Sequence, residues 1–112
     1  MKMTPQSLTD AIQTHRVFPF AESLDLSYCN ISDKTIYDVC MWISRAGFPR
    51  LTDLNLYFNE IGEAGWLVLS SFLRDDSAFQ KIVSLNIAFN QAHGCAAIVH
   101  AVKRVGSHTV SG

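Results

Sequence analysis

The chain repeats one pattern of apolar and polar positions three times. Apolar or small residues stand at its first, fourth, sixth and eleventh positions, and an asparagine or cysteine stands at its ninth. This pattern fits neither the 3.6-residue period of a helix nor the alternation of a strand. The copies are residues 21–32, 51–62 and 82–93, and their fourth positions lie 30 and then 31 residues apart. Such self-similarity predicts a chain built from one structural unit.

A segment with the period of a helix follows each copy. Apolar residues recur three and four positions apart in 32–47, 62–76 and 93–106, which predicts amphipathic helices with one buried face. A further helix is predicted at about 5–15, because Thr4 can cap it and Pro5 is accepted in a first turn. Short strands that alternate with helices predict a parallel sheet with right-handed crossovers.

The pattern L-x-x-L-x-L-x-x-(N/C)-x-(I/L), followed by a helix, resembles the leucine-rich repeat. The repeat length, and Gly65 four residues after Ile61, resemble the ribonuclease-inhibitor-like class. The first copy, LDLSYCNISDKTI, also resembles the cysteine-containing repeats of F-box substrate receptors. The resemblance covers about 20–106. It implies an α/β fold, a short solenoid shaped as a horseshoe arc, with the parallel sheet on the concave side and the helices on the convex side.

We expect a single domain over residues 1–112. It would comprise an N-terminal helix or cap, three repeats and a tail, at 1–19, 20–50, 51–81, 82–106 and 107–112. The tail and the two residues before it, which together read VGSHTVSG, offer no evident capping element. We therefore expect the sheet edge of the last repeat to be exposed, which calls for a permanent neighbour or a longer chain.

The ninth positions are expected to form a structural ladder. A sharp bend after each strand leaves backbone groups without partners, and each such buried group costs ~1–3 kcal/mol. An asparagine amide both donates and accepts hydrogen bonds, and cysteine is a small, buriable substitute. The ladder consists of Cys29, Asn59 and Asn90.

The residues between the inward-facing apolar side chains are predicted to bind a partner on the concave face. Two interpretations are open for the polar columns: a solvated sheet surface or a binding surface. For the aromatic column, the rings either stack on one another and cover the core or anchor a partner. The candidate residues are Ser23, Asp25, Ser27, Tyr28, Asp53, Asn55, Tyr57, Phe58, Ser84, Asn86 and Phe89.

Composition narrows the classes of partner. The chain is 48% apolar and 17% charged with a net charge of −1, which is typical of an ordered globular protein without the basic surface that binds nucleic acid or anionic membranes. No apolar run approaches the ~20 residues of a membrane helix. The N-terminus lacks the features of a signal peptide, and Cys29, Cys40 and Cys95 lack CxxC spacing. We therefore expect free thiols and an intracellular, cytoplasmic location.

Candidate catalytic and metal-binding groups are sparse. Cys95 and His100 would stand about 140° apart around a helix, so a core cysteine with His93 and His100 at the surface is favoured over a zinc site. Trp66 is expected in the core. Trp42 is expected to be partly exposed on the outer surface, where a convex-side contact is the less favoured of its possible roles.

We predict no enzyme activity, cofactor or metal. The predicted function is a non-catalytic protein–protein interaction module of adaptor, scaffold or receptor type. The alternative is a fixed structural subunit of a larger assembly, or a fragment of a longer repeat protein. The oligomeric state stays open.

Overall fold

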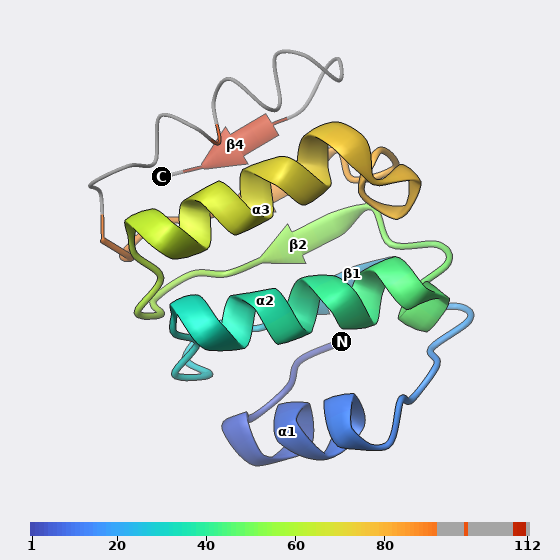
Figure 1. Cartoon of the computed structure of the whole chain (residues 1–112). Coiled ribbons are helices and arrows are strands. Elements are labelled where there is room, and N and C mark those ends of the chain that lie inside the picture. Colours follow the sequence, from blue (N-terminus) through green and yellow to red (C-terminus); the bar gives the residue numbers. More distant parts are fainter. Residues whose placement is uncertain (92–97, 99–108, 112) are drawn as a thin grey trace.

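A computed structural model of the chain describes residues 1–91, 98 and 109–111 (Figure 1). The elements are α1 (Pro5–Gln13), β1 (Ser23–Asp25), α2 (Asp33–Trp42), the π-helix η1 (Ile43–Gly47), β2 (Asp53–Asn55), α3 (Glu63–Asp75), the 3₁₀ helix η2 (Ser77–Phe79), β3 (Ser84–Asn86) and β4 (Thr109–Ser111). The helix predicted at 93–106 lies outside the described residues, apart from the buried Ile98.

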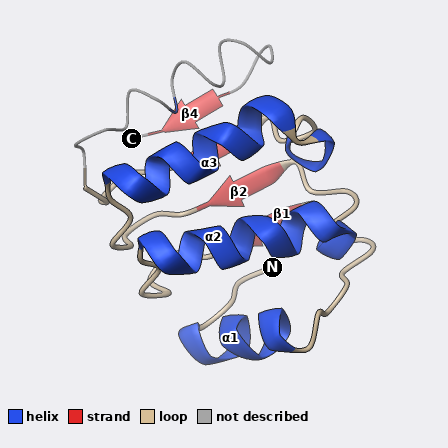
Figure 2. Cartoon of the chain, in the orientation of Figure 1, coloured by secondary structure: helices blue, strands red, loops and turns tan. Residues whose placement is uncertain are grey.

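The strands form one parallel sheet in the order β1-β2-β3-β4. Its register aligns the repeats position by position, since Leu24 pairs with Leu54 and Leu54 with Leu85. The three α-helices lie side by side across one face of this sheet (Figure 2). The predicted α/β fold with a parallel sheet is therefore confirmed, and it is compatible with a leucine-rich-repeat-like architecture.

The core lies between the sheet and the helices. Because side chains alternate along a strand, the leucines at the fourth and sixth pattern positions point together towards the helices. Leu24, Leu26, Leu54, Leu56 and Leu85 are all at most 2% exposed. The helices contribute their apolar faces, which include Ile36, Val39, Cys40, Trp66, Leu69 and Leu73.

Helix starts follow the capping residues. Thr4 accepts a hydrogen bond from the backbone of Ser7 at 3.1 Å at the start of α1. Ser32 accepts one from the backbone of Thr35 at 3.4 Å at the start of α2. Each bond satisfies a backbone N–H that has no partner within its helix.

The first and the last of the three predicted strands, β1 and β3, have further pairing partners that the sequence pattern did not indicate. The backbone N–H of Met3 donates to Asp25 O at 3.0 Å, and that of Asp25 donates to Met1 O at 2.7 Å, so the first residues extend the sheet beyond β1. At the other side, β4 pairs with β3. The strand of the last repeat is therefore not at the edge of the sheet, which corrects the expectation for β3, and β4 is the outermost strand. The segment Thr109–Ser111 holds one apolar residue and is too short for its alternation to indicate a strand.

Trp42 is buried, which corrects the expectation of a partly exposed side chain. It is 5% exposed, and its indole Nε1 donates to Arg16 O at 2.8 Å. Its ring packs edge-on against Phe18 and Phe48, with centroid distances of 6.2 and 4.8 Å. The segment between α1 and β1 folds over the end of α2 and covers the indole.

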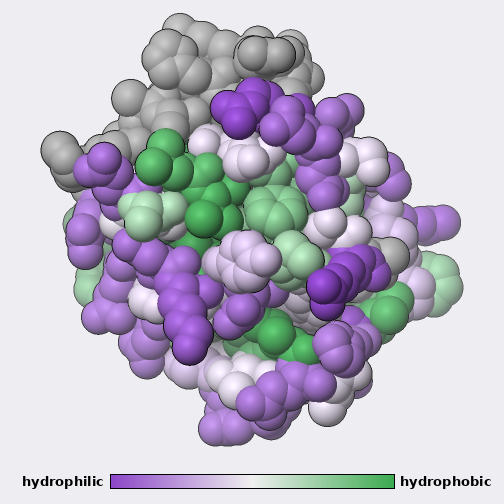
Figure 3. Space-filling model, in the orientation of Figure 1, coloured by the Kyte–Doolittle hydropathy of each residue, from purple (hydrophilic) through white to green (hydrophobic). Residues whose placement is uncertain are grey.

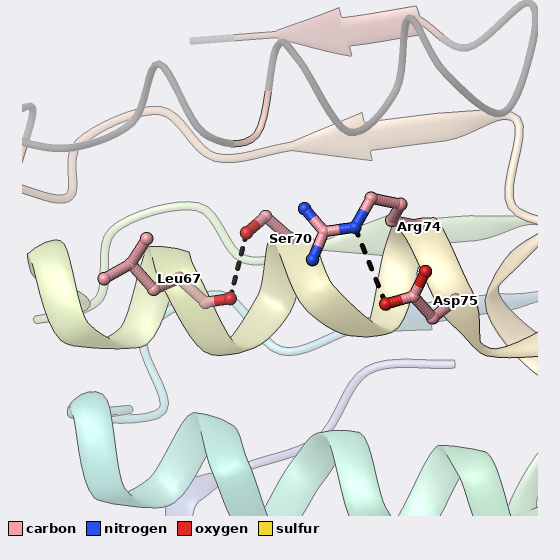
Figure 4. Close-up of polar contacts among 4 residues, drawn as sticks. All are labelled: Leu67, Ser70, Arg74 and Asp75. Carbon is pink, nitrogen blue, oxygen red and sulfur yellow. Dashed lines mark hydrogen bonds and ion pairs between the residues drawn. The ribbon is translucent and has the colours of Figure 1, made fainter.

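Helix α3 carries two local polar interactions, one at the buried Ser70 and one at the exposed Arg74. In α3, Ser70 Oγ donates to Leu67 O at 2.9 Å, and Arg74 Nε lies 3.5 Å from Asp75 Oδ2 (Figure 4). That ion pair is exposed and contributes little to stability. Figure 3 shows this side of the molecule, where hydrophobic side chains are interspersed with polar ones. No helix in the described part of the chain is long and apolar enough to cross a bilayer.

We expect Gly65→Ala to destabilise the fold by about 1 kcal/mol. A Cβ there would lie 2.7 Å from both Asp33 Oδ1 and Ile61 Cγ2, and overpacking of ~1–3 kcal/mol outweighs the ~0.5–1 kcal/mol that alanine gains in a helix. Urea unfolding followed by circular dichroism measures the change. The reverse substitution at the exposed neighbour, Ala64→Gly, calibrates helix propensity. A Gly65→Ala variant more stable than wild type would contradict the close packing of α3 on α2.

Candidate functional site

The sheet face opposite the helices, here called the open face, is polar and hollowed. Six residues belong to it: Ser23, Asp25, Asp53, Asn55, Ser84 and Asn86. Together with Leu24 and Leu54 they line a hollow of about 350 Å³. Pairing of the strands places Ser23 beside Asp53 and Asp53 beside Ser84. The predicted columns are therefore neighbours across the sheet.

One column of the open face also holds the backbone at the end of each strand. Asp25 Oδ1 accepts from the backbone N–H of Ser27 at 2.9 Å. Asn55 Oδ1 accepts from Tyr57 at 2.9 Å, and Asn86 Oδ1 from Ala88 at 3.0 Å. Short acidic or amide side chains favour such bonds to the residue two positions on. An aspartate or asparagine stands at this position in all three copies. That recurrence was a sequence signal for a bond to the backbone, and the sequence-based prediction missed it.

Asp25 and Asp53 lie in different electrostatic surroundings. Burial alone would raise the pKa of the Asp25 carboxyl, but hydrogen bonds from Ser27 and the positive charges of Lys2 and the N-terminal amine lower it below its usual value. Asp53 is exposed on the central part of the open face. Its carboxylate has no hydrogen-bond or ion-pair partner among the residues that the structure describes.

Ser27 is a correction to the candidate set. Its side chain was expected on the partner-binding surface, but the residue is only 7% exposed. The Lys2 ammonium donates to the Ser27 carbonyl and, at 2.7 Å, to Met3 O. The first residues of the chain therefore cover this position.

Four aromatic rings form a continuous cluster at the ends of the strands. This aromatic ridge consists of Tyr28, Tyr57, Phe58 and Phe89. Tyr28 stacks on Phe58 with a centroid distance of 4.7 Å, and Tyr57 packs edge-on against Phe89 at 5.2 Å. Tyr28, Phe58 and Phe89 are nevertheless 56%, 50% and 69% exposed. The rings stack on one another, as one interpretation predicted, yet much of their surface faces solvent.

The ridge is held at a cost in backbone energy. Tyr28, Phe58 and Phe89 have φ values of 56°, 53° and 56°, a left-handed conformation that costs an ordinary residue roughly 1–2 kcal/mol. Glycine or asparagine adopts it more easily. The repeat thus places an aromatic side chain three times at a bend where the backbone itself favours other residues.

Asn59 pairs the backbone of two successive bends. Its Oδ1 accepts from the N–H groups of Cys29 and Ile31, both at 3.0 Å. Its Nδ2 donates to Leu26 O at 2.9 Å and Leu56 O at 3.0 Å. Asn59 is 8% exposed, so water offers these groups little alternative.

The other two ladder positions make related contacts. Asn90 Oδ1 accepts from the Ile61 N–H at 3.1 Å, and its Nδ2 donates to Leu56 O at 2.8 Å. The Cys29 thiol donates to Met3 O at 3.3 Å, and burial raises the pKa of this thiol. The ladder therefore links each bend to the one before it.

The histidine and cysteine candidates yield no site in the described part of the chain. His93, Cys95 and His100 lie outside the described residues. Elsewhere, among residues 1–91, 98 and 109–111, no three His, Cys, Asp or Glu side chains gather to hold a metal ion. Cys40 is completely buried, which raises the pKa of its thiol, and it serves as a core residue.

Comparison with known proteins supports a leucine-rich repeat in the first copy. A family model described as Leucine Rich repeat matches residues 22–36, which span β1, the bend and the start of α2. A search of the curated proteins finds no match. Leucine-rich-repeat domains are in general non-catalytic modules that bind proteins.

We expect Asn59→Ala to lower the free energy of unfolding by about 2 kcal/mol or more, because it leaves several buried backbone groups unpaired. Urea unfolding measures the loss. Gln80→Ala, which shortens an exposed amide side chain, is the control and should change stability little. Equal stability of Asn59→Ala and wild type would contradict the structural role of the ladder.

We expect the effect of Asp25→Asn on stability to depend on pH. Asparagine keeps an oxygen for the Ser27 N–H, as Asn55 and Asn86 do in their repeats, but it carries no charge. Because the folded pKa of Asp25 is lowered, its ionised form stabilises the fold above the unfolded pKa of ~3.9, and this contribution disappears as pH falls through the folded pKa.

The Asp25→Asn variant should therefore be less stable than wild type at neutral pH, with the difference shrinking below about pH 4. Urea unfolding of both proteins over a pH series tests this. A difference that stays constant across the series would show that the Asp25 charge plays no part.

Proposed function

We propose that this chain is a non-catalytic protein-interaction module of the leucine-rich-repeat type. In this proposal the repeats belong to the ribonuclease-inhibitor-like class and form a short arc whose open face is concave. A protein partner binds across the open face and the aromatic ridge. The observation that carries the proposal is the ridge itself: exposed rings kept at three equivalent left-handed positions beside a polar hollow.

Exposed aromatic rings next to polar groups are the usual anchors of protein interfaces. The ridge rings are already restrained by their mutual contacts, so a partner loses little side-chain entropy in ordering them. The proposed contact residues are those of the open face and the ridge: Ser23, Asp25, Tyr28, Asp53, Asn55, Tyr57, Phe58, Ser84, Asn86 and Phe89.

The ionisable groups of this surface support binding rather than catalysis. General acid–base catalysis at neutral pH needs a group whose pKa lies near 7. The pKa of Asp25 is lowered. The pKa of Tyr57 is raised, by desolvation and by the neighbouring Tyr28. Both shifts move the groups away from neutrality.

An adaptor, scaffold or receptor role is favoured over a fixed subunit that needs a neighbour to cover its sheet. Pairing of β3 with β4 and of β1 with the first residues supports this preference. Cys29 and Cys40 are buried free thiols, which suits the reducing interior of a cell. We therefore place the module in the cytoplasm.

Selection of a displayed library of random linear peptides on the purified chain tests the proposal. We expect selected peptides to lose binding to Ser84→Arg, whose side chain fills the open-face hollow. They should retain binding to Ser71→Arg, the same change on the exposed surface of α3. Neither serine makes a side-chain hydrogen bond within the described part of the chain. Peptides that lose binding only to Ser71→Arg, or an absence of selected peptides, would contradict the proposal.

A further inference from the structure

Carboxylates flank the aromatic ridge on both sides. The open-face hollow, which Asp25 and Asp53 help to line, is formed by residues that precede the rings in each copy. After the rings lies a second hollow of about 200 Å³, lined by Tyr28, Asn30, Phe58, Asn59 and Glu60. None of the residues that line these two hollows is basic. A partner that covers the ridge therefore meets negative charge at either end.

Two of these carboxylates are available to a partner. Asp53 and Glu60 are exposed, and neither side chain has a hydrogen-bond or ion-pair partner in residues 1–91, 98 and 109–111. Asp25 differs, since it bonds to Ser27 and lies near Lys2. The Lys2 ammonium itself donates to the carbonyls of Met3 and Ser27, which keeps it at the β1 edge.

The exposed rings of the ridge suit a planar cation. A guanidinium stacks on aromatic faces and binds carboxylates through two parallel hydrogen bonds, whereas an ammonium acts as a point charge. The chain uses such pairs elsewhere: the Arg16 guanidinium lies 5.1 Å from the centroid of Phe18, and that of Arg50 lies 5.7 Å from that of Phe20. Among the described residues, no cation occupies the rings of the ridge.

The spacing fits an extended peptide. Asp53 and Tyr57 are four residues apart on one strand and its continuation, which corresponds to roughly 13 Å at the rise of an extended chain. A peptide lying along the strand covers that distance with about four residues. Arginines a few positions apart could then reach Asp53, the rings and Glu60 in turn.

We infer that the segment recognised by this surface is an extended, arginine-bearing peptide of a protein partner. Guanidinium groups stack on the aromatic ridge and pair with Asp53 and Glu60. This inference rests on the proposed function and specifies its partner.

The test measures binding of the full chain to three fluorescein-labelled peptides by fluorescence anisotropy. Each is an unstructured Gly/Ser peptide with spaced basic positions, filled by arginine, by lysine, or by citrulline, the uncharged isostere of arginine. We expect arginine to bind about two- to five-fold more tightly than lysine. Citrulline should bind about ten-fold more weakly than arginine or worse. A citrulline peptide that binds as well as the arginine peptide would overturn the inference.

Two isosteric or conservative variants assign the contacts. Asp53→Asn should weaken the binding of the arginine peptide and of the lysine peptide by similar factors, because it removes only a charge. Phe89→Leu should reduce the preference for the arginine peptide over the lysine peptide. It should change the affinity for the lysine peptide little. The matched controls lie on the helical side, Asp75→Asn at the end of α3 and Tyr37→Leu on α2. They should not alter binding. Control variants with losses equal to those of Asp53→Asn and Phe89→Leu would overturn the assignment.

Failure of the inference is distinguishable from failure of the proposed function. If selected library peptides bind in a way that Ser84→Arg abolishes, while the arginine peptide does not bind, the partner class is wrong and the open face remains the binding surface. If neither kind of peptide binds the open face, the proposed function is wrong as well.

Discussion

The fold depends on satisfying buried backbone groups at the sharp bend that follows each strand. Asn59 does this with one side chain, since its oxygen accepts from Cys29 and Ile31 and its nitrogen donates to Leu26 and Leu56. Because these partners belong to successive repeats, the same bonds hold the bends and also fix the register of one repeat against the next. The inward-facing leucines then pack with the apolar faces of the helices in one hydrophobic core.

The bend also creates the surface that we propose as the binding site of a partner. A left-handed residue turns the chain at each copy, and that residue is Tyr28, Phe58 or Phe89. The buried amide of Asn59 stabilises the bend through hydrogen bonds on its inner side, while the aromatic ring is exposed to solvent. The structural role and the proposed function thus fall on adjacent residues: an asparagine is held inside the bend, and an aromatic side chain is exposed outside it. Backbone strain of this kind is sustained only where the surrounding contacts determine the conformation.

The sequence predicted the features that repeat. Three aligned copies indicated the parallel sheet, the buried leucines and the helical layer, because periodic burial leaves a periodic pattern. It did not predict the features that occur once. The pairing of Met1–Met3 with β1, the strand β4 and the burial of Trp42 under the α1–β1 connection depend on single tertiary contacts. The candidate site was predicted by column, but Ser27 proved to be buried and Asp25, Asn55 and Asn86 also bond to the backbone.

Amide hydrogen exchange, followed by NMR in the free protein, tests the central claim most directly. If the Asn59 side chain holds the bends, the N–H groups of Cys29 and Ile31 exchange only on global unfolding, with protection equal to that of the Leu56 N–H, which donates to Asn86 O in the sheet. Exchange of the Cys29 and Ile31 amides at rates close to those of an unfolded chain, while Leu56 stays protected, would contradict the account.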